Sequence, residues 1–406
     1  MRLFRCSACD QLLYFENRRC EKCGHDLGYI PETNDLAAIE RDGDSAPDPD
    51  LAHWQGTWQG TWRDIAGPPG KRYRFCANAA HDACNWLVAA DGEEEFCLAC
   101  RHNRMVPDLS VAVNLRKWRK VEVAKHRLIY SLVRLNLPLE SNEDREGGLC
   151  FDFLADTPDG SAPKIMTGHD EGLITIALAE ADDAEREQRR NVLGELYRTL
   201  LGHFRHEVGH YYWNCLVRDA GRIQAFRTMF GDESVDYSEA LKTYYNSVPP
   251  PDWQVNFVSA YATAHPWEDF AETFKHYIHI VDTLEMAGAF GMRVRPWLDS
   301  TGDLAATVDF NPYRYCSIQQ MLDAWLPISF ALNNLNRCLG MSDAYPFILG
   351  PGVIAKLGFM HELVHRRVEA DPEQETSDTE MPAGRGEDAA DAPEGAPESR
   401  PVAAEA

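Results

Sequence analysis

The sequence predicts an α+β protein with three parts: a cysteine-rich module over residues 1–105, a mostly helical domain with a small β-sheet over residues 106–366, and an acidic tail over residues 367–406. Three observations support this division. Eight of the 12 cysteines lie in the first 100 residues. From residue 106 onward, apolar residues recur at helical spacing, interrupted by short strand-like runs. The tail is rich in Pro, Glu, Ala and Asp, a composition typical of disorder.

The first four cysteines form two close pairs, in the pattern Cys6-x2-Cys9-x10-Cys20-x2-Cys23. Gly24 follows the second pair, where the turn of a zinc knuckle needs a permissive residue. Two knuckles separated by a hairpin-sized loop are typical of a zinc ribbon, in which four thiolates hold a structural zinc ion. Because the N-terminus has no apolar stretch of signal-peptide length, we expect a reducing cytoplasmic location, which disfavours disulfides.

The second group of cysteines is less regular. Cys97 and Cys100 form a knuckle, whereas Cys76 and Cys84 are too far apart in sequence to form one. We expect all four to hold a second structural zinc ion. Two alternatives remain open: a histidine replaces one cysteine, or Cys84 belongs to the core. The candidate histidines are His81 and His102.

The charge of the chain argues against a nucleic-acid partner. The formal net charge is −24, and residues 369–406 contain 12 acidic and 2 basic residues. An acidic protein has no overall electrostatic attraction to phosphate backbones. The zinc ribbons are therefore expected either to stabilise the fold or to bind a protein partner. No apolar run is long enough to span a membrane, so no membrane association is expected.

The region after residue 106 begins with a predicted helix. Asp108 or Ser110 can cap it, and it runs to about Leu135. Its apolar positions at helical spacing include Val123, Leu128, Ile129, Leu132 and Val133. Two predicted strands follow, over Leu149–Leu154 and Gly172–Leu178, and the chain is then largely helical from about Ala184 to residue 365.

The segment His206-Glu207-Val208-Gly209-His210 carries the main functional prediction. Two histidines four residues apart lie on one face of a helix, so both imidazoles can reach a single metal ion. Glu207, next to the first histidine, can hold a water molecule and accept its proton. Zinc suits this set because two imidazoles and a carboxylate leave a fourth position open. Gly209 allows a close backbone approach on one side.

A downstream helix start supplies the expected third ligand. Pro266 begins this helix, and Glu268 and Glu272 follow on one face. We expect Glu268 to bind the catalytic zinc, and Glu272 to accept a hydrogen bond from a ligand histidine and orient it. Alternatives to Glu268 are His265, Asp269 and Glu239. Three further histidines are not expected to bind this metal: His203, His276 and His279.

The combined motifs resemble two related groups of metallopeptidases. The HExGH segment, Tyr261, and the Glu268–Glu272 segment are similar to the metal site of gluzincin peptidases of the anthrax lethal factor type. The N-terminal cysteine pairs together with these motifs resemble bacterial zinc-binding metallopeptidases that carry an N-terminal zinc ribbon. This resemblance covers residues 1–365 and implies a zincin-like peptidase domain. It also implies that Glu268 is the third zinc ligand and that the Tyr261 hydroxyl points into the site.

The function expected from the sequence is therefore zinc-dependent hydrolysis of peptide or protein substrates, with one catalytic and two structural zinc ions. Glu207 would act as general base, and Tyr261 could hydrogen-bond the developing oxyanion. The strand at Gly172–Leu178 could offer an edge to an extended peptide. One alternative function is a non-catalytic interaction protein that keeps a relic HExxH helix. Another is a different hydrolase in which Cys150 is a metal ligand.

Overall fold

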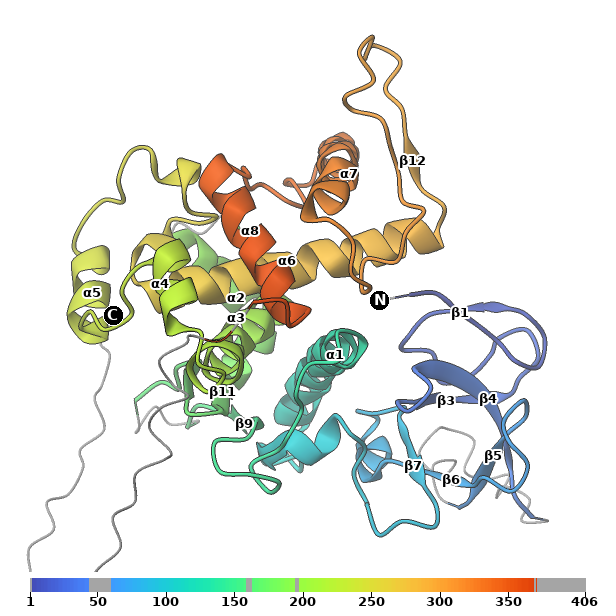
Figure 1. Ribbon diagram of the computed structural model, residues 1–406. Helices are drawn as coiled ribbons and strands as arrows, with labels where there is room; N and C mark the ends of the chain where they lie inside the picture. Colours follow the sequence, from blue (N-terminus) through green and yellow to red (C-terminus); the bar gives the residue numbers. More distant parts are fainter. Residues whose placement is uncertain (1, 44–59, 158–162, 194–196, 369, 371–406) are drawn as a thin grey trace, which may run out of the picture. The chain divides into compact units, whose positions relative to one another are not determined.

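The computed structural model describes residues 2–43, 60–157, 163–193, 197–368 and 370. Nearly all of the predicted acidic tail lies outside these residues. The described chain confirms the α+β class, with short strands near the N-terminus followed by helices and a second small sheet (Figure 1). The first 100 residues also hold two clusters of four cysteines.

The N-terminal region contains a five-stranded antiparallel sheet in the order β3-β4-β5-β6-β7. A bridge between Tyr29 and Trp86, with a hydrogen bond from Tyr29 N to Asn85 O of 2.9 Å, joins the first strand to the start of the last and closes the sheet. This small barrel was not predicted from the sequence, because three of its strands are only three residues long. The strands are β3 (Asp26–Ile30), β4 (Asp35–Arg41), β5 (Trp62–Asp64), β6 (Tyr73–Phe75) and β7 (Leu87–Ala89), preceded by the β1 (Phe4–Arg5) and β2 (Leu12–Leu13) hairpin.

The second sheet has four strands in the order β10-β11-β9-β8. Strand β9 (Cys150–Leu154) pairs in parallel with β8 (Asn103–Met105) and β11 (Leu173–Ala177), whereas β10 (Gly168–Asp170) pairs with β11 in the antiparallel direction. Both predicted strands are present. The expectation that Gly172–Leu178 offers a free edge is wrong, because β11 lies between β9 and β10; β10 is the edge strand on this side of the sheet.

Helix α1 (Ala112–Arg134) is the predicted first helix, but its start differs from the prediction. Its N-cap is Val111, without a side-chain cap, and Asp108 instead accepts a hydrogen bond from Ser110 N of 2.9 Å in the preceding turn. Leu128, Ile129 and Leu132 are buried as expected, whereas Val123 is exposed.

Several of the remaining helices pack against α6 (Pro266–Ala289), the long helix in Figure 1. Helix α3 (Leu200–Trp213) carries the HEVGH segment and packs against both α6 and α1, while α8 (Pro351–Val364) also packs against α6. The other elements are η2 (Ala77–His81), η3 (Cys100–His102), η4 (Leu178–Ala181), α2 (Asp183–Leu193), the π-helical turn η5 (Asn214–Arg218), α4 (Ile223–Phe230), α5 (Tyr237–Tyr245), η6 (Trp253–Val255), η7 (Tyr261–Thr263), β12 (Arg293–Val294), β13 (Ala306–Thr307) and α7 (Ile318–Cys338).

One hydrophobic core extends from the N-terminal region into the helical domain. Tyr130 of α1 packs against Phe15 with ring centroids 5.4 Å apart, and Phe15 packs in turn on Tyr29 and Trp86. These aromatic contacts join the cysteine-rich region to α1 by buried apolar surface, which is the main source of stability in such contacts.

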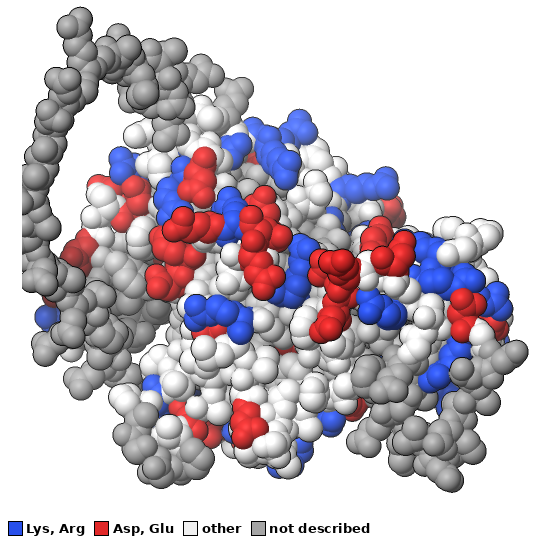
Figure 2. Space-filling view, turned by 90° about the horizontal axis from the view of Figure 1, so that it is seen from below, with Lys and Arg blue, Asp and Glu red and all other residues white. Residues whose placement is uncertain are grey.

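The surface seen in Figure 2 carries basic and acidic side chains side by side, in alternation rather than in large areas of one sign. Within the described ranges, no helix has the length and apolar character needed to cross a membrane.

Candidate metal centre and active-site cleft

Helix α3 presents both motif histidines and Glu207 from one segment. Thr199 caps the helix, since its side chain accepts a hydrogen bond from Gly202 N of 3.0 Å. Phe204 and Val208 point into the core and are fully buried. This buried apolar face fixes the rotation of the helix, so that His206, Glu207 and His210 face the cleft.

Helix α6 brings the two glutamates to these histidines. The His265 side chain caps the helix by accepting a hydrogen bond from Trp267 N of 3.1 Å, and Pro266 occupies its first turn. Glu268 and Glu272, one turn apart, are buried and face α3. The helix start predicted from Pro266 therefore places both carboxylates against the HEVGH segment.

Gly209 allows this close approach of α3 to α6. A Cβ atom at this position would lie 2.9 Å from Ala271 Cα and 3.2 Å from Ala271 O, both backbone atoms of α6. A side chain at residue 209 would therefore push the two helices apart.

We expect a Gly209→Ala variant to lose about 1–3 kcal/mol of unfolding free energy, the usual cost of overpacking a well-packed contact. Denaturant unfolding of the zinc-loaded protein measures this loss. Gly358→Ala on α8 is the matched control, because its added Cβ would meet Ile318 at 3.6 Å, an ordinary contact. Equal stability of the two variants would contradict the close-approach explanation.

Three ligand atoms converge in the arrangement that a zinc ion requires. His206 Nε2 lies 3.0 Å from Glu268 Oε2 and 3.3 Å from His210 Nε2, and His210 Nε2 lies 3.6 Å from Glu268 Oε2. Tetrahedral zinc with bonds of about 2.0–2.2 Å holds neighbouring N and O ligands about 3.3–3.6 Å apart. Glu268 Oε2 is buried and has no hydrogen-bond donor in the described chain, as expected for an atom whose partner is a metal ion. These residues therefore fit zinc.

The ligand atoms are oriented by a second layer of hydrogen bonds. Glu272 Oε1 lies 2.8 Å from His206 Nδ1, so this nitrogen carries the proton and Nε2 is left to bind metal. Lys275 donates to the same carboxylate at 2.8 Å. The Tyr237 hydroxyl of α5 donates to Glu268 Oε1 at 2.6 Å. The sequence predicted the Glu272 contact but not Tyr237, which no local motif marks.

Electrostatics of the metal-free site favour a bound cation. Burial opposes protonation of His206, but Glu268 and Glu272 outweigh it and raise the pKa of His206 to about 10. Burial lowers the pKa of His210 to about 4, so that imidazole stays neutral and available as a ligand. Two carboxylates that stabilise a protonated imidazole so strongly give the site a negative potential, which a divalent ion can neutralise.

Glu207 does not belong to this set of three ligand atoms and faces the cleft. Burial raises its pKa, but contact with His169 and the nearby His206 outweigh burial and hold the pKa below its ordinary value. Glu207 is therefore ionised near neutral pH, as a general base must be.

His169, from edge strand β10, is a second site residue that the sequence did not suggest. Its ring stacks on His210 with centroids 3.7 Å apart and planes at 9°, and its Nδ1 lies 3.6 Å from Glu207 Oε2. A single histidine in a strand gives no sequence signal, and only the pairing of β10 with β11 brings it to α3.

Tyr261 lines the same cleft, with its ring centroid 5.9 Å from that of His206. Its hydroxyl makes no hydrogen bond to the part of the chain that the structure describes. Burial raises the pKa of Tyr261 well above its ordinary value, so the hydroxyl keeps its proton and remains a donor.

The cleft has a volume of about 820 Å³ and is large enough for several side chains of a ligand. Strand β10 forms one wall, and the segments 213–223, 233–237 and 261–268 form the others. Besides the residues above, its lining includes Thr167, Asp170, Glu171, Trp213, Asn214, Arg218, Ile223, Glu233, Ser234, Val235 and Trp267.

The alternatives to Glu268 have other partners. Asp269 forms an ion pair with Lys356 of 2.6 Å, His265 caps α6, and Glu239 is exposed beside Lys242. Cys150 belongs to none of the metal-ligand groups found among the described residues. The three histidines that were not expected at the metal site have other partners: His203 faces Glu180, His276 forms a hydrogen bond with the Tyr345 hydroxyl, and His279 packs on Trp325.

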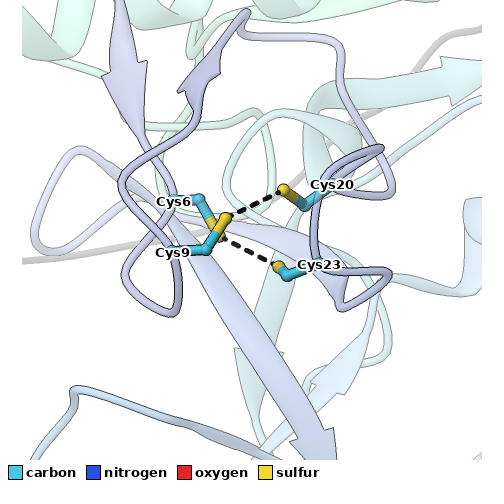
Figure 3. A group of neighbouring side chains, drawn as sticks. All are labelled: Cys6, Cys9, Cys20 and Cys23. Carbon is cyan, nitrogen blue, oxygen red and sulfur yellow. Dashed lines mark hydrogen bonds between the residues drawn. The ribbon is translucent and has the colours of Figure 1, made fainter.

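The first cysteine cluster has the geometry of a four-thiolate zinc site (Figure 3). Cys6 and Cys9 come from one loop and Cys20 and Cys23 from another, and all four side chains point toward one another. The Sγ atoms of Cys6 and Cys23 are 3.6 Å apart, as are those of Cys9 and Cys20. Zinc–sulfur bonds of about 2.3 Å place tetrahedral sulfurs about 3.8 Å apart, in agreement with these distances.

The second cluster brings Cys76, Cys84, Cys97 and Cys100 together, with Cys84 Sγ 3.7 Å from Cys97 Sγ. Cys84 is therefore part of the cluster and not only of the core. The two histidines considered as substitutes lie outside it. His102 Nδ1 bonds Leu149 O at 2.8 Å, and His81 packs on Trp118 with ring centroids 5.9 Å apart.

Comparison with protein families agrees with this geometry. A family described as "Putative zinc-binding metallo-peptidase" matches residues 114–363, and a family described as "zinc-ribbon domain" matches residues 3–111. The chain belongs to this zinc-binding metallopeptidase family. The family expected from the sequence is thus confirmed, and its matched range contains α3, α6 and the three convergent ligand atoms. The likeness to the lethal factor type of site stays a prediction.

Three relatives match most of the chain. Proteins from two strains of Mycobacterium tuberculosis and one of Mycobacterium bovis, each with the name "Uncharacterized protein", are 37% identical over 366 residues. These alignments cover 90% of this chain and 95% of each relative. No solved structure matches the chain.

Proposed function

We propose that this protein is a zinc-dependent peptidase whose active site is built by α3, α6 and β10. The observation that carries the proposal is the spacing of His206 Nε2, His210 Nε2 and Glu268 Oε2 at 3.0–3.6 Å beside the carboxylate of Glu207. Three protein ligands leave the fourth position of zinc open, which distinguishes a catalytic centre from a closed structural one.

Glu207 is the general base in this proposal. Its carboxylate accepts the proton of the attacking water and then delivers it to the leaving amine of the cleaved peptide bond. His169 contacts Glu207 on the cleft side and would hold its carboxylate in place. When bound, zinc supplies the Lewis acidity that polarises the peptide carbonyl and makes water acidic.

Tyr261 is proposed to donate its O–H group to the oxygen that gains charge as the carbonyl is attacked. Its hydroxyl proton is retained at neutral pH, and its ring lies beside His206. Tyr237 has a different role, because its hydroxyl already binds Glu268 and so fixes a metal ligand.

Strand β10 is proposed to bind the peptide substrate. It pairs with β11 on one side and has no strand partner among the described residues on the other. Because Gly168, His169 and Asp170 line the cleft, a peptide added along this edge would pass the metal ligands. Main-chain hydrogen bonds would hold such a substrate in extended form.

A cytoplasmic location and a peptide or protein substrate belong to the same proposal. All 12 cysteines are free, in keeping with a reducing compartment. The net charge of −24 favours neutral or basic polypeptides over nucleic acid as partners.

A peptide-library assay tests this function. The zinc-loaded protein should cleave a subset of peptides, lose that activity after dialysis against a chelator, and regain it when zinc is added back. Metal content measured in parallel shows whether the chelator removed zinc from the protein. A fully zinc-loaded protein that cleaves no peptide of a broad library would contradict the proposal and favour a non-catalytic role.

A further inference from the structure

The second cysteine cluster is surrounded by polar side chains from α1, a helix outside the cysteine-rich region. Glu122 and Lys125 are fully buried beside it, and His126 is 5% exposed. Lys125 Nζ lies 2.9 Å from Glu122 Oε2, and Glu122 Oε2 lies 3.7 Å from Cys100 Sγ. Buried charged groups are retained only where they have partners, and here Glu122 and Lys125, in the middle of α1, pair with each other beside Cys100.

His126 makes the closest approach of this group to the sulfurs. Its Nε2 atom lies 3.2 Å from Cys84 Sγ and 3.7 Å from Cys100 Sγ. Trp86 packs edge-on against the imidazole, with ring centroids 5.2 Å apart. The ring is therefore held with Nε2 directed between two cysteines.

The other ring nitrogen identifies the tautomer. His126 Nδ1 lies 2.6 Å from the backbone oxygen of Glu122, and a carbonyl oxygen can only accept a hydrogen bond. Nδ1 therefore carries the proton, and in a neutral imidazole Nε2 presents its lone pair to the sulfurs. This is the usual arrangement of a metal-binding histidine, which donates its second N–H group to a backbone carbonyl or a carboxylate.

We propose that His126 is a zinc ligand of the second cluster, which is then a mixed site of three thiolates and one imidazole. Zinc bonds of about 2.3 Å to sulfur and 2.0–2.1 Å to nitrogen place tetrahedral S and N ligands about 3.6 Å apart. The separations of 3.2 and 3.7 Å from Nε2 to Cys84 and Cys100 lie on either side of this value. One of the four cysteines of this cluster is left as a thiol.

Charge also favours the mixed site. Zinc with four thiolates carries two negative charges, whereas zinc with three thiolates and a neutral imidazole carries one. The cluster is buried next to the Glu122 carboxylate, and Lys125 supplies a single compensating positive charge. The lower charge of the mixed site reduces the cost of burial.

If His126 of α1 binds this zinc ion, the metal joins the cysteine-rich region to α1, and through α1 to α3, the helix that carries the HEVGH segment. Helix α1 packs directly on α3. Ser131 of α1 donates to Asp282 at 2.8 Å, and Asp282 forms an ion pair with Arg205, the residue before His206. The zinc ion would thus stabilise the packing of α1 on α3 behind the active site, and not only the fold of the cysteine-rich region.

Cadmium-113 NMR of the full chain, substituted with cadmium and labelled with nitrogen-15 in histidine, tests the proposal. We expect two resonances from the cysteine sites, and one of them should show scalar coupling to a single histidine nitrogen and lie upfield of the other. The centre at His206, His210 and Glu268 has no sulfur ligand and resonates far upfield of both. Its occupancy therefore has no influence on the result.

Matched variants assign the coupled resonance. His126→Ala should remove the coupling, and His126→Cys should convert the site to an all-sulfur resonance. His25→Ala is the control, because His25 Nδ1 also contacts a sulfur, at 3.2 Å from Cys23 Sγ, but touches only that one; this variant should keep the coupling. Two all-sulfur resonances without histidine coupling in the wild-type chain would overturn the proposal, even if His126→Ala failed to fold.

Discussion

A Glu207→Gln variant is expected to lose peptide cleavage while keeping its zinc. The amide has nearly the same shape but cannot accept a proton from water, so kcat/KM should fall by about 10²–10⁴-fold, the usual contribution of a positioned base. Zinc content should stay equal to that of the wild type, because the proposed ligands are His206, His210 and Glu268. Cleavage of the best library peptide and metal analysis give the two readouts.

Glu239→Gln is the control for this variant, since Glu239 is exposed on α5 and forms an ion pair with Lys242. Its activity should match that of the wild type. Retention of full activity in Glu207→Gln would rule out the proposed base, whereas loss of zinc in that variant would mean that Glu207 is itself a ligand.

A Glu268→Ala variant should lose one zinc ion per chain, from three to two, together with its activity. Removing this buried carboxylate leaves two of the three proposed ligands, both imidazoles, and the Tyr237 hydroxyl loses its acceptor. The two cysteine clusters are built from other residues and should keep their metal. Metal analysis after gel filtration measures the stoichiometry.

Glu272→Gln is the matched comparison, one helical turn further along α6. It removes the charge that orients His206 but leaves all three ligand atoms in place. Metal affinity should fall by about 10–100-fold, the usual effect of changing such a supporting partner, and excess zinc should restore occupancy. Unchanged zinc content in Glu268→Ala would show that another residue is the third ligand.

The sequence predicted the part of the site that is local along the chain. His206, Glu207 and His210 lie on one helical turn, and Pro266 marks the start of the helix that presents Glu268 and Glu272, so spacing alone indicates their common faces. The close contact of α3 with α6 at Gly209 then completes the arrangement. Such patterns depend only on helix geometry, which a sequence reveals well.

The rest of the site depends on contacts between distant segments. His169 reaches Glu207 because β10 pairs at the edge of the sheet, and Tyr237 reaches Glu268 from α5. His126 lies 42 residues from Cys84 in sequence. Each is a single polar residue without a repeating pattern, so nothing in the sequence separates it from a surface residue.

The N-terminal barrel was missed for a related reason. Strands β5, β6 and β7 have three residues each, too few to show alternation, and closure depends on the bridge of Tyr29 to Trp86. The cysteine spacing predicted that each set of four cysteines comes together, as the structure shows, but it gave no sign of the barrel.

Anomalous diffraction from crystals of the wild-type protein, measured on both sides of the zinc absorption edge, tests the central claim most directly. We expect a zinc peak within about 2.0–2.2 Å of His206 Nε2, His210 Nε2 and Glu268 Oε2, with Glu207 outside bonding distance. Zinc confined to the two cysteine clusters, or a peak at this centre that excludes Glu268, would contradict it.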